Sequence, residues 1–186
     1  MEKVESRFKG FTLIESVIVI IIMGLAMITI TNFLVPQISR SANPHYQTRA
    51  AALGQSVMTQ ILARGFDHNS DFTGGVRRCG EVIAGQATVS CTAQADFGAE
   101  EDVGVEPEAI RPDLYNDVDD FIGCWEPQAA NGCRDLNLLL ADNSYRNFRL
   151  DISVSYANGT SLKRIRLTIS ATNQSPVNLS AYRGNY

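Results

Sequence analysis

An acidic stretch in the second half of the chain carries the kind of side-chain oxygens that bind hard metal ions. Residues 113–123 read Asp-Leu-Tyr-Asn-Asp-Val-Asp-Asp-Phe-Ile-Gly. Calcium prefers carboxylate and amide oxygens, but the stretch lacks the glycine and terminal glutamate spacing of an EF-hand loop. Two interpretations stay open: a solvated acidic turn, and a calcium site that makes the surrounding domain rigid. The candidate ligands are Asp113, Asn116, Asp117, Asp119 and Asp120.

The four cysteines form a second group of reactive side chains. Their even number favours disulfides formed in an oxidising compartment. Four cysteines permit three pairings, and the sequence alone does not choose among them. We favour the pairing of sequence neighbours, which closes two short loops: Cys79 with Cys91, and Cys124 with Cys133.

The sequence gives little support for a zinc site, for catalysis or for nucleic-acid binding. The chain has no Cys-x-x-Cys, and His45 and His68 lie far from the cysteines in sequence. It also has no Gly-x-Ser-x-Gly, no His-Glu-x-x-His and no glycine-rich phosphate loop. The net charge is −4, and the basic residues are scattered rather than clustered. We therefore expect no enzyme, no nucleic-acid partner and no cofactor apart from the calcium considered above.

The element that precedes these residues is unusually apolar. The chain has 186 residues, of which 45% are hydrophobic, which suits one modest globular domain plus an accessory element. No charged residue occurs between Ser16 and Ser39, and a helix over this stretch would cross a bilayer. Lys3, Arg7 and Lys9 precede it, so we expect the N-terminus in the cytoplasm and the chain after Arg40 on the other side.

The start of this span differs from an ordinary secretory signal, in which cleavage follows the apolar region. Here Lys9-Gly10-Phe11-Thr12-Leu13-Ile14-Glu15 places the processing point before it. This segment resembles the prepilin N-terminus of type IV pilins and type II secretion pseudopilins: a charged leader, a glycine, and then Phe-Thr-Leu-Ile-Glu. The motif covers only the N-terminal part of the chain, but its order and spacing are specific.

The resemblance implies a role for three residues. Residues 1–10 would be a leader, removed by a membrane-embedded prepilin peptidase that cuts between Gly10 and Phe11 and then methylates the new amine of Phe11. Glycine at the cut lets the backbone approach the peptidase closely because it has no Cβ. In this family, the glutamate that corresponds to Glu15 neutralises the terminal amine of a neighbouring subunit and sets the axial register. The alternative is an interfacial acid that reaches water without a partner.

We expect one helix over residues 11–64, with a membrane-spanning stalk over 11–39 and an amphipathic half over 40–64. Gly24 and Pro36 mark the part of the stalk most able to kink or melt. Residues 39–44, which end in Pro44, are a candidate helix break. The amphipathic half has apolar residues at three- and four-residue spacing: Tyr46, Ala50, Leu53, Val57 and Ile61.

Residues 65–186 are expected to form a β-rich head. Residues 86–91 are a candidate short strand. The clearest pattern is the alternation of apolar and polar residues over 148–156 and 164–170, joined by an Asn158-Gly159 turn, which predicts a hairpin with one buried face. The predicted fold is α+β, with a long helix packed on an antiparallel sheet. This is also the architecture that the resemblance to type IV pilins implies.

Two patches of the head add a narrower resemblance. Tyr-Asn-Asp-Val-Asp-Asp-Phe at 115–121 and the ending Leu-Ser-Ala-Tyr-Arg-Gly-Asn-Tyr are similar to minor pilins of the mannose-sensitive haemagglutinin (MSHA) pilus, particularly the D-type subunit.

The narrower resemblance implies a structural subunit held in the bacterial inner membrane, with its head in the periplasm, before it joins a pilus used in surface attachment. Its partners would be other pilins, the prepilin peptidase and the inner-membrane assembly platform. The alternatives are a pseudopilin of type II secretion and a sugar-binding adhesin with Trp125 as a stacking platform.

Overall fold

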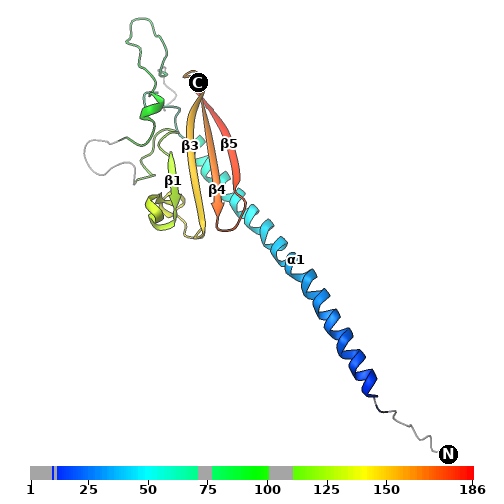
Figure 1. The fold of residues 1–186 in the computed structure, drawn as a ribbon. Coiled ribbons are helices and arrows are strands. Elements are labelled where there is room, and N and C mark those ends of the chain that lie inside the picture. Colours follow the sequence, from blue (N-terminus) through cyan, green and yellow to red (C-terminus); the bar gives the residue numbers. More distant parts are fainter. Residues whose placement is uncertain (1–9, 11, 71–76, 101–110) are drawn as a thin grey trace, which may run out of the picture. The chain divides into compact units, whose positions relative to one another are not determined.

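The computed structural model describes residues 10, 12–70, 77–100 and 111–186. One long helix and a five-stranded sheet dominate it (Figure 1). The predicted α+β class, with an apolar N-terminal helix and a β-rich head, is confirmed. The elements are α1 (Leu13–Leu62), η1 (Gln94–Asp96), β1 (Gly123–Glu126), η3 (Pro127–Gly132), β2 (Arg134–Asp135), α2 (Leu136–Leu140), β3 (Phe148–Asn158), β4 (Leu162–Ala171) and β5 (Val177–Gly184).

The helix α1 contributes to two compact units, Met1–His45 and Tyr46–Tyr186. Its backbone is helical through Gly24, Pro36 and Pro44, so the break expected at residues 39–44 is absent. A proline inside a helix removes one backbone hydrogen bond and strains the preceding turn, but the helix on either side supplies enough bonds to continue past it. The Asn116 carbonyl accepts a hydrogen bond from the Gly65 amide, 3.0 Å away, just after the helix ends.

The sheet has the strand order β2-β1-β3-β4-β5. The predicted hairpin is confirmed: β3 and β4 are antiparallel neighbours, with Ile152 opposite Leu167. The strand β5, which the sequence analysis did not predict, lies antiparallel to β4 on its other side. Figure 1 shows β3, β4 and β5 side by side in this order.

One edge of the sheet differs from the expectation of a wholly antiparallel sheet. The strand β2 runs parallel to β1, with Trp125 opposite Arg134. Parallel strands need a connection that reverses the chain twice, rather than a hairpin turn. The connection here is η3, in which Gln128, Ala129 and Asn131 have positive φ angles.

The candidate strand at residues 86–91 is absent; the structure shows an irregular segment there. The Gly80 amide donates to the Val89 carbonyl at 2.6 Å, and a disulfide joins Cys79 to Cys91. The segment is therefore held as a closed loop and not by a strand partner.

The core of the second unit lies between the end of α1 and the sheet. All five apolar residues predicted for the inner helix face are buried, and Tyr46 donates a hydrogen bond to the Ile169 carbonyl at 3.2 Å. Burial of each large apolar side chain contributes about 1.5–3 kcal/mol, so this helix face is a main source of the head's stability. The alternating residues of β3 and β4 supply the other side: Phe148, Leu150, Ile152, Val154, Ile165, Leu167 and Ile169.

Candidate functional site

The N-terminal motif lies at the start of α1. The Thr12 carbonyl accepts hydrogen bonds from the amides of Glu15 and Ser16 at 3.1 and 3.2 Å, which forms the first helical turn. Gly10 is exposed, and no atom lies within 4 Å of the position that a Cβ would take there. Phe11 and the leader residues 1–9 lie outside the described residues, so their predicted roles remain predictions.

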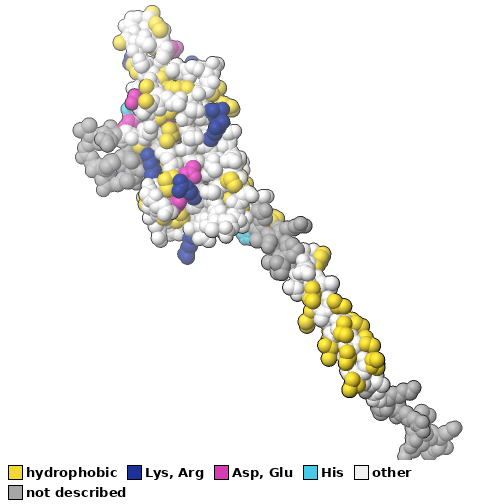
Figure 2. All heavy atoms as spheres, viewed as in Figure 1, with side chains coloured by type: hydrophobic (Ala, Val, Ile, Leu, Met, Phe, Trp, Pro, Cys, Tyr) yellow, Lys and Arg dark blue, Asp and Glu magenta, His cyan; other side chains and the backbone are white. Residues whose placement is uncertain are grey.

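The first part of α1 has an apolar surface that no described part of the chain covers. Leu13–Leu34 has a mean hydropathy of 2.7, and none of this stretch is buried. Figure 2 shows hydrophobic side chains along it. By length and composition it can cross a membrane, because 22 residues rise roughly 33 Å and the hydrocarbon core is about 30 Å thick.

The hydroxyl groups of this stretch are suited to an apolar solvent. Ser16, Thr29 and Thr31 each donate to a carbonyl of their own helix, three or four residues earlier, at 2.8 Å. A polar group in lipid needs such an internal partner, since no water is available there.

Glu15 differs from these residues. It lies in the first turn of α1, where the helix dipole favours a negative charge, and its side chain is exposed. Within the part of the chain that the structure describes, no ion pair involves Glu15. A carboxylate at this position is therefore available to a cation from outside the described residues.

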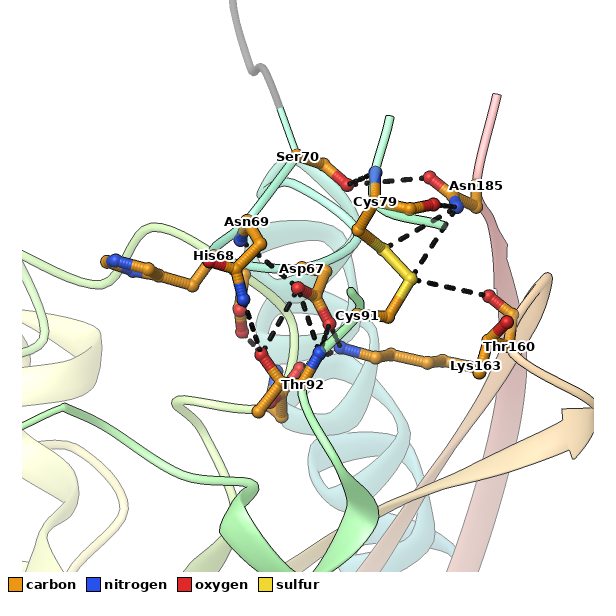
Figure 3. A network of polar contacts seen from close by, with 12 residues as sticks. Asp67, His68, Asn69, Ser70, Cys79, Cys91, Thr92, Thr160, Lys163 and Asn185 are labelled. Carbon is orange, nitrogen blue, oxygen red and sulfur yellow. Dashed lines mark hydrogen bonds and ion pairs between the residues drawn. A yellow bond between two sulfur atoms is a disulfide. The ribbon is translucent and has the colours of Figure 1, made fainter. Parts of the chain in front are cut away.

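The head contains a buried ionic centre that the sequence analysis missed. Lys163 of β4 is fully buried, and its Nζ lies 3.1 Å from Asp67 Oδ2 (Figure 3). The same Nζ also pairs with Asp119 Oδ1. Asp67 follows the end of α1 and also accepts hydrogen bonds from the Thr92 amide at 3.0 Å and hydroxyl at 3.1 Å. The centre thus joins four parts of the head: the end of α1, the loop before η1, the sheet, and the acidic stretch of residues 113–123, called the acidic turn below.

Aromatic rings surround the ammonium of Lys163. Its Nζ lies 4.9 Å from the ring centre of Phe66, 4.4 Å from that of Phe97 and 5.7 Å from that of Tyr156. Burial, and then the nearby carboxylates, raise the pKa of Tyr156 well above its usual value. Because this lysine is fully buried and ion-paired, it offers no group that a substrate can reach.

The acidic turn divides the five predicted calcium ligands. Asp113 is exposed and pairs with Arg111 at 2.7 Å, and hydrogen bonds from Arg111 lower the pKa of Asp113. Asp119 turns toward Lys163 instead. Of the predicted ligands that are aspartates, only Asp117 and Asp120 belong to a cluster of potential ligand atoms. The third residue of this cluster is Glu100, which the sequence analysis did not select.

Hydrogen bonds inside the turn fix its two clustered carboxylates. Asp120 Oδ2 accepts from the amides of Asn116 and Asp117 at 2.7 and 3.0 Å, and Asp117 Oδ1 accepts from the Asp119 amide at 2.8 Å. Burial, followed by the charges of Asp119 and Asp120, raises the pKa of Asp117 to about 9. The turn therefore holds acidic side chains together at close range.

Both predicted disulfides are present, Cys79–Cys91 and Cys124–Cys133. No cysteine is free to bind zinc among the residues that the structure describes.

Trp125 is buried in the core, and its indole N–H donates to the Phe121 carbonyl at 3.0 Å. It is therefore not a stacking platform for a sugar.

Comparison with known proteins identifies one feature. Residues 6–31 match the family model of the prokaryotic N-terminal methylation motif. Neither a curated protein nor a solved structure matches the chain. The motif match supports a type IV pilin-like or pseudopilin chain, which is a class of structural subunits that a prepilin peptidase processes. The match and the apolar helix are consistent with anchoring in the inner membrane.

Proposed function

We propose that this chain is a structural minor pilin of an MSHA-like type IV pilus, and that it is incorporated into, or primes, a filament used in surface attachment. The observation that carries the proposal is the combination, in one segment, of the methylation motif at residues 6–31 with an uncovered apolar helix over Leu13–Leu34. The narrower assignment to an MSHA-type pilus rests on the similarity of residues 115–121 and 179–186 to minor pilins of that pilus.

In this proposal, the prepilin peptidase cuts after Gly10 and methylates the amine of Phe11. The apolar part of α1 holds the subunit in the inner membrane, with the N-terminus in the cytoplasm and the head in the periplasm, and later packs against other pilins in the filament. The assembly platform of the inner membrane moves the subunit between these states. The positively charged residues before the span support this orientation.

Glu15 supplies the register of assembly. An acid in an apolar layer is costly unless it has a partner, and the α-amino group of a neighbouring subunit is a cation at the same depth. Its exposure, and the absence of an ion pair to it among the described residues, support this role. Gly24 and Pro36 would allow α1 to bend or melt as the subunit enters the filament.

A pseudopilin of type II secretion is the second candidate, because the same motif serves both classes. It would build a short periplasmic piston and not an external fibre. Deletion of the gene in its own host separates the two: loss of surface attachment supports the pilus, and loss of enzyme secretion supports the piston.

The test of the class is the mass and N-terminal sequence of the full chain, expressed with and without a prepilin peptidase. We expect a chain that begins at N-methylated Phe11 only when the peptidase is present. Gly10→Val should block cleavage, because a branched side chain hinders close approach of the backbone. Gly24→Val is the matched control, since a Cβ at Gly24 would also have no atom within 4 Å, and this variant should be cleaved normally. A chain that still begins at Met1 in cells with the peptidase would refute the proposal.

A further inference from the structure

The head brings together three carboxylates from two distant segments. Glu100 ends the described segment 77–100, whereas Asp117 and Asp120 belong to the acidic turn. Each offers one carboxylate oxygen, and these three oxygens lie within 4.8 Å of one another. Oxygen ligands of calcium lie about 2.3–2.6 Å from the ion, so two ligands of one ion are at most about 5 Å apart. The spacing therefore fits a single ion.

A second observation concerns the hydrogen bonds of Asp117. Its side chain is fully buried, and Oδ1 accepts from the Asp119 amide. Its other oxygen, Oδ2, is buried and accepts no hydrogen bond from the residues that the structure describes. A buried carboxyl oxygen left in this way is costly, and a bound cation is one of the partners that stabilise such a group.

The neighbouring amide of Asn116 shows the same feature. Its Oδ1 is buried and accepts no hydrogen bond in the described part of the chain. Its Nδ2 lies 3.0 Å from His68 Nδ1, which in turn lies 3.6 Å from Glu100 Oε1. The side chain of Asn116 and that of Glu100 therefore lie against the same histidine, and the buried Oδ1 of Asn116 is the candidate for a fourth ligand.

The head has more buried acidic groups than buried basic groups among the described residues. Four aspartates of the head are fully buried, and Lys163 is the one buried cation among the described residues. Lys163 is already committed to two of these acids, Asp67 and Asp119. Asp117 forms no ion pair within the described part of the head, so an ionised Asp117 has no counter-charge there.

We propose that Glu100, Asp117 and Asp120, with Asn116 Oδ1, bind one calcium ion. All four donors are oxygens, which favours a hard cation over zinc. Calcium accepts irregular arrangements of ligands from separate loops, whereas magnesium demands a near-octahedral site. The ion would join the end of segment 77–100 to the acidic turn. Of the five ligands expected from the sequence, Asp113 and Asp119 are not part of this set.

The test is calcium binding to the full chain in detergent micelles, after treatment with a chelator, by isothermal titration calorimetry. We expect one calcium per chain, and weaker binding of magnesium. Asp117→Asn keeps the size of the side chain and the acceptor for the Asp119 amide but removes the charge. Loss of a group that only supports a metal ligand lowers affinity about 10–100-fold, so loss of this ligand should weaken calcium binding by at least about tenfold.

Asp113→Asn is the matched control, because it removes the same charge from the same turn outside the ligand set, and it should bind calcium as the unchanged chain does. Glu100→Gln, on the other segment, gives a second readout if Asp117→Asn fails to fold, and it should also weaken binding. Any of four results would overturn the proposal: no calcium binding by the unchanged chain, unchanged affinity in Asp117→Asn and Glu100→Gln, an equal loss in Asp113→Asn, or binding of magnesium in preference to calcium.

Discussion

Lys163 Nζ lies 3.1 Å from Asp67 Oδ2, and both side chains are wholly buried. Asp67 follows the long helix, whereas Lys163 lies on strand β4 within the sheet, so the pair joins the two main elements of the head. A second bond from Lys163, to Asp119, adds the acidic turn to the same centre. The centre is therefore the point at which helix, turn and sheet are held in one arrangement.

Replacement of Lys163 by methionine should destabilise the head strongly. Removal of one partner from a buried ion pair leaves the other charge without compensation, which costs about 3–5 kcal/mol. Urea unfolding of the chain, followed by the fluorescence of its single tryptophan, Trp125, measures this loss. Trp125 is buried in the same core and reports its opening.

Arg149→Met is the matched control for this substitution. Arg149 also lies on the sheet and pairs with Asp151 and Glu126, but its side chain is 42% exposed. Exposed pairs contribute about 0–1 kcal/mol, so its loss should be small. Equal losses in the two variants would contradict a special role for the buried centre.

The sequence contains a sign of this centre, although the sequence analysis did not use it. Lys163 stands two residues before Ile165 and is in phase with the buried face of β4, where a lysine is unexpected unless it has a buried partner. Its partners could not be predicted, since Asp67 and Asp119 come from segments without a regular pattern.

The proposed calcium ligands also show which residues the sequence can select and which only the folded structure brings together. The composition of the acidic turn suffices to select Asp117 and Asp120. It does not distinguish them from Asp113, which has the same chemistry but faces solvent. Glu100 comes close to them only because the folded chain brings its segment next to the acidic turn.

Strand β5 was missed for a related reason. It is an edge strand with few large apolar residues, and its pairing with β4 defines it.

The metal-free head should lose stability as the pH rises from 5 to 8. An aspartate in the unfolded chain loses its proton near pH 4, whereas burial and the charges of Asp119 and Asp120 raise the pKa of Asp117 to about 9 in the folded chain. Between these values the folded chain binds one more proton than the unfolded chain, so its stability falls with increasing pH, by up to about 1.4 kcal/mol per pH unit.

Urea unfolding in the presence of a chelator, at several pH values, tests this dependence. Lys163, Glu100 and His68 also face the turn, so the comparison is with Asp117→Asn, which keeps these groups and lacks the titrating carboxyl. The variant should show a clearly smaller slope. Equal slopes in the two proteins would mean that Asp117 is already deprotonated at pH 5.

Gly54 should not tolerate a branched side chain. A Cβ at this position would lie 2.8 Å from Ile169 Cδ1 and still closer to Leu179 Cδ1, because α1 packs directly on β4 and β5 here. Gly54→Val should therefore destabilise the head by about 1–3 kcal/mol, the usual cost of overpacking. Leu179→Ala, in the same chain, should restore part of this loss, since it removes the closest atoms.

A double-mutant cycle in thermal unfolding measures this compensation. Two contacting positions are coupled by about 0.5–3 kcal/mol, whereas distant positions are additive. Additive losses at positions 54 and 179 would show that the helix and the edge strand do not touch as the structure describes.

Glu15→Ala should leave membrane insertion and processing intact but reduce incorporation into filaments. Insertion does not need the acid, because a carboxylate in an apolar span is unfavourable, by up to about 2.5–3.5 kcal/mol near the bilayer centre. Incorporation needs it in our proposal, since a neighbour's terminal amine would otherwise enter the apolar filament core without a counter-ion. The measurement is the ratio of this chain in sheared filaments to that in membranes, together with its intact mass.

Ser16→Ala is the matched control for Glu15→Ala. Ser16 is the next residue, is exposed in the same turn, and donates its hydroxyl to the Leu13 carbonyl of its own helix at 2.8 Å. Its replacement therefore removes a polar group that already has a partner, and incorporation should stay normal. If Glu15→Ala is incorporated as well as Ser16→Ala, the acid has no role in assembly. If Glu15→Ala instead retains its leader, the acid acts in recognition by the peptidase. Reduced incorporation would then follow from the missing amine at Phe11, which only cleavage creates.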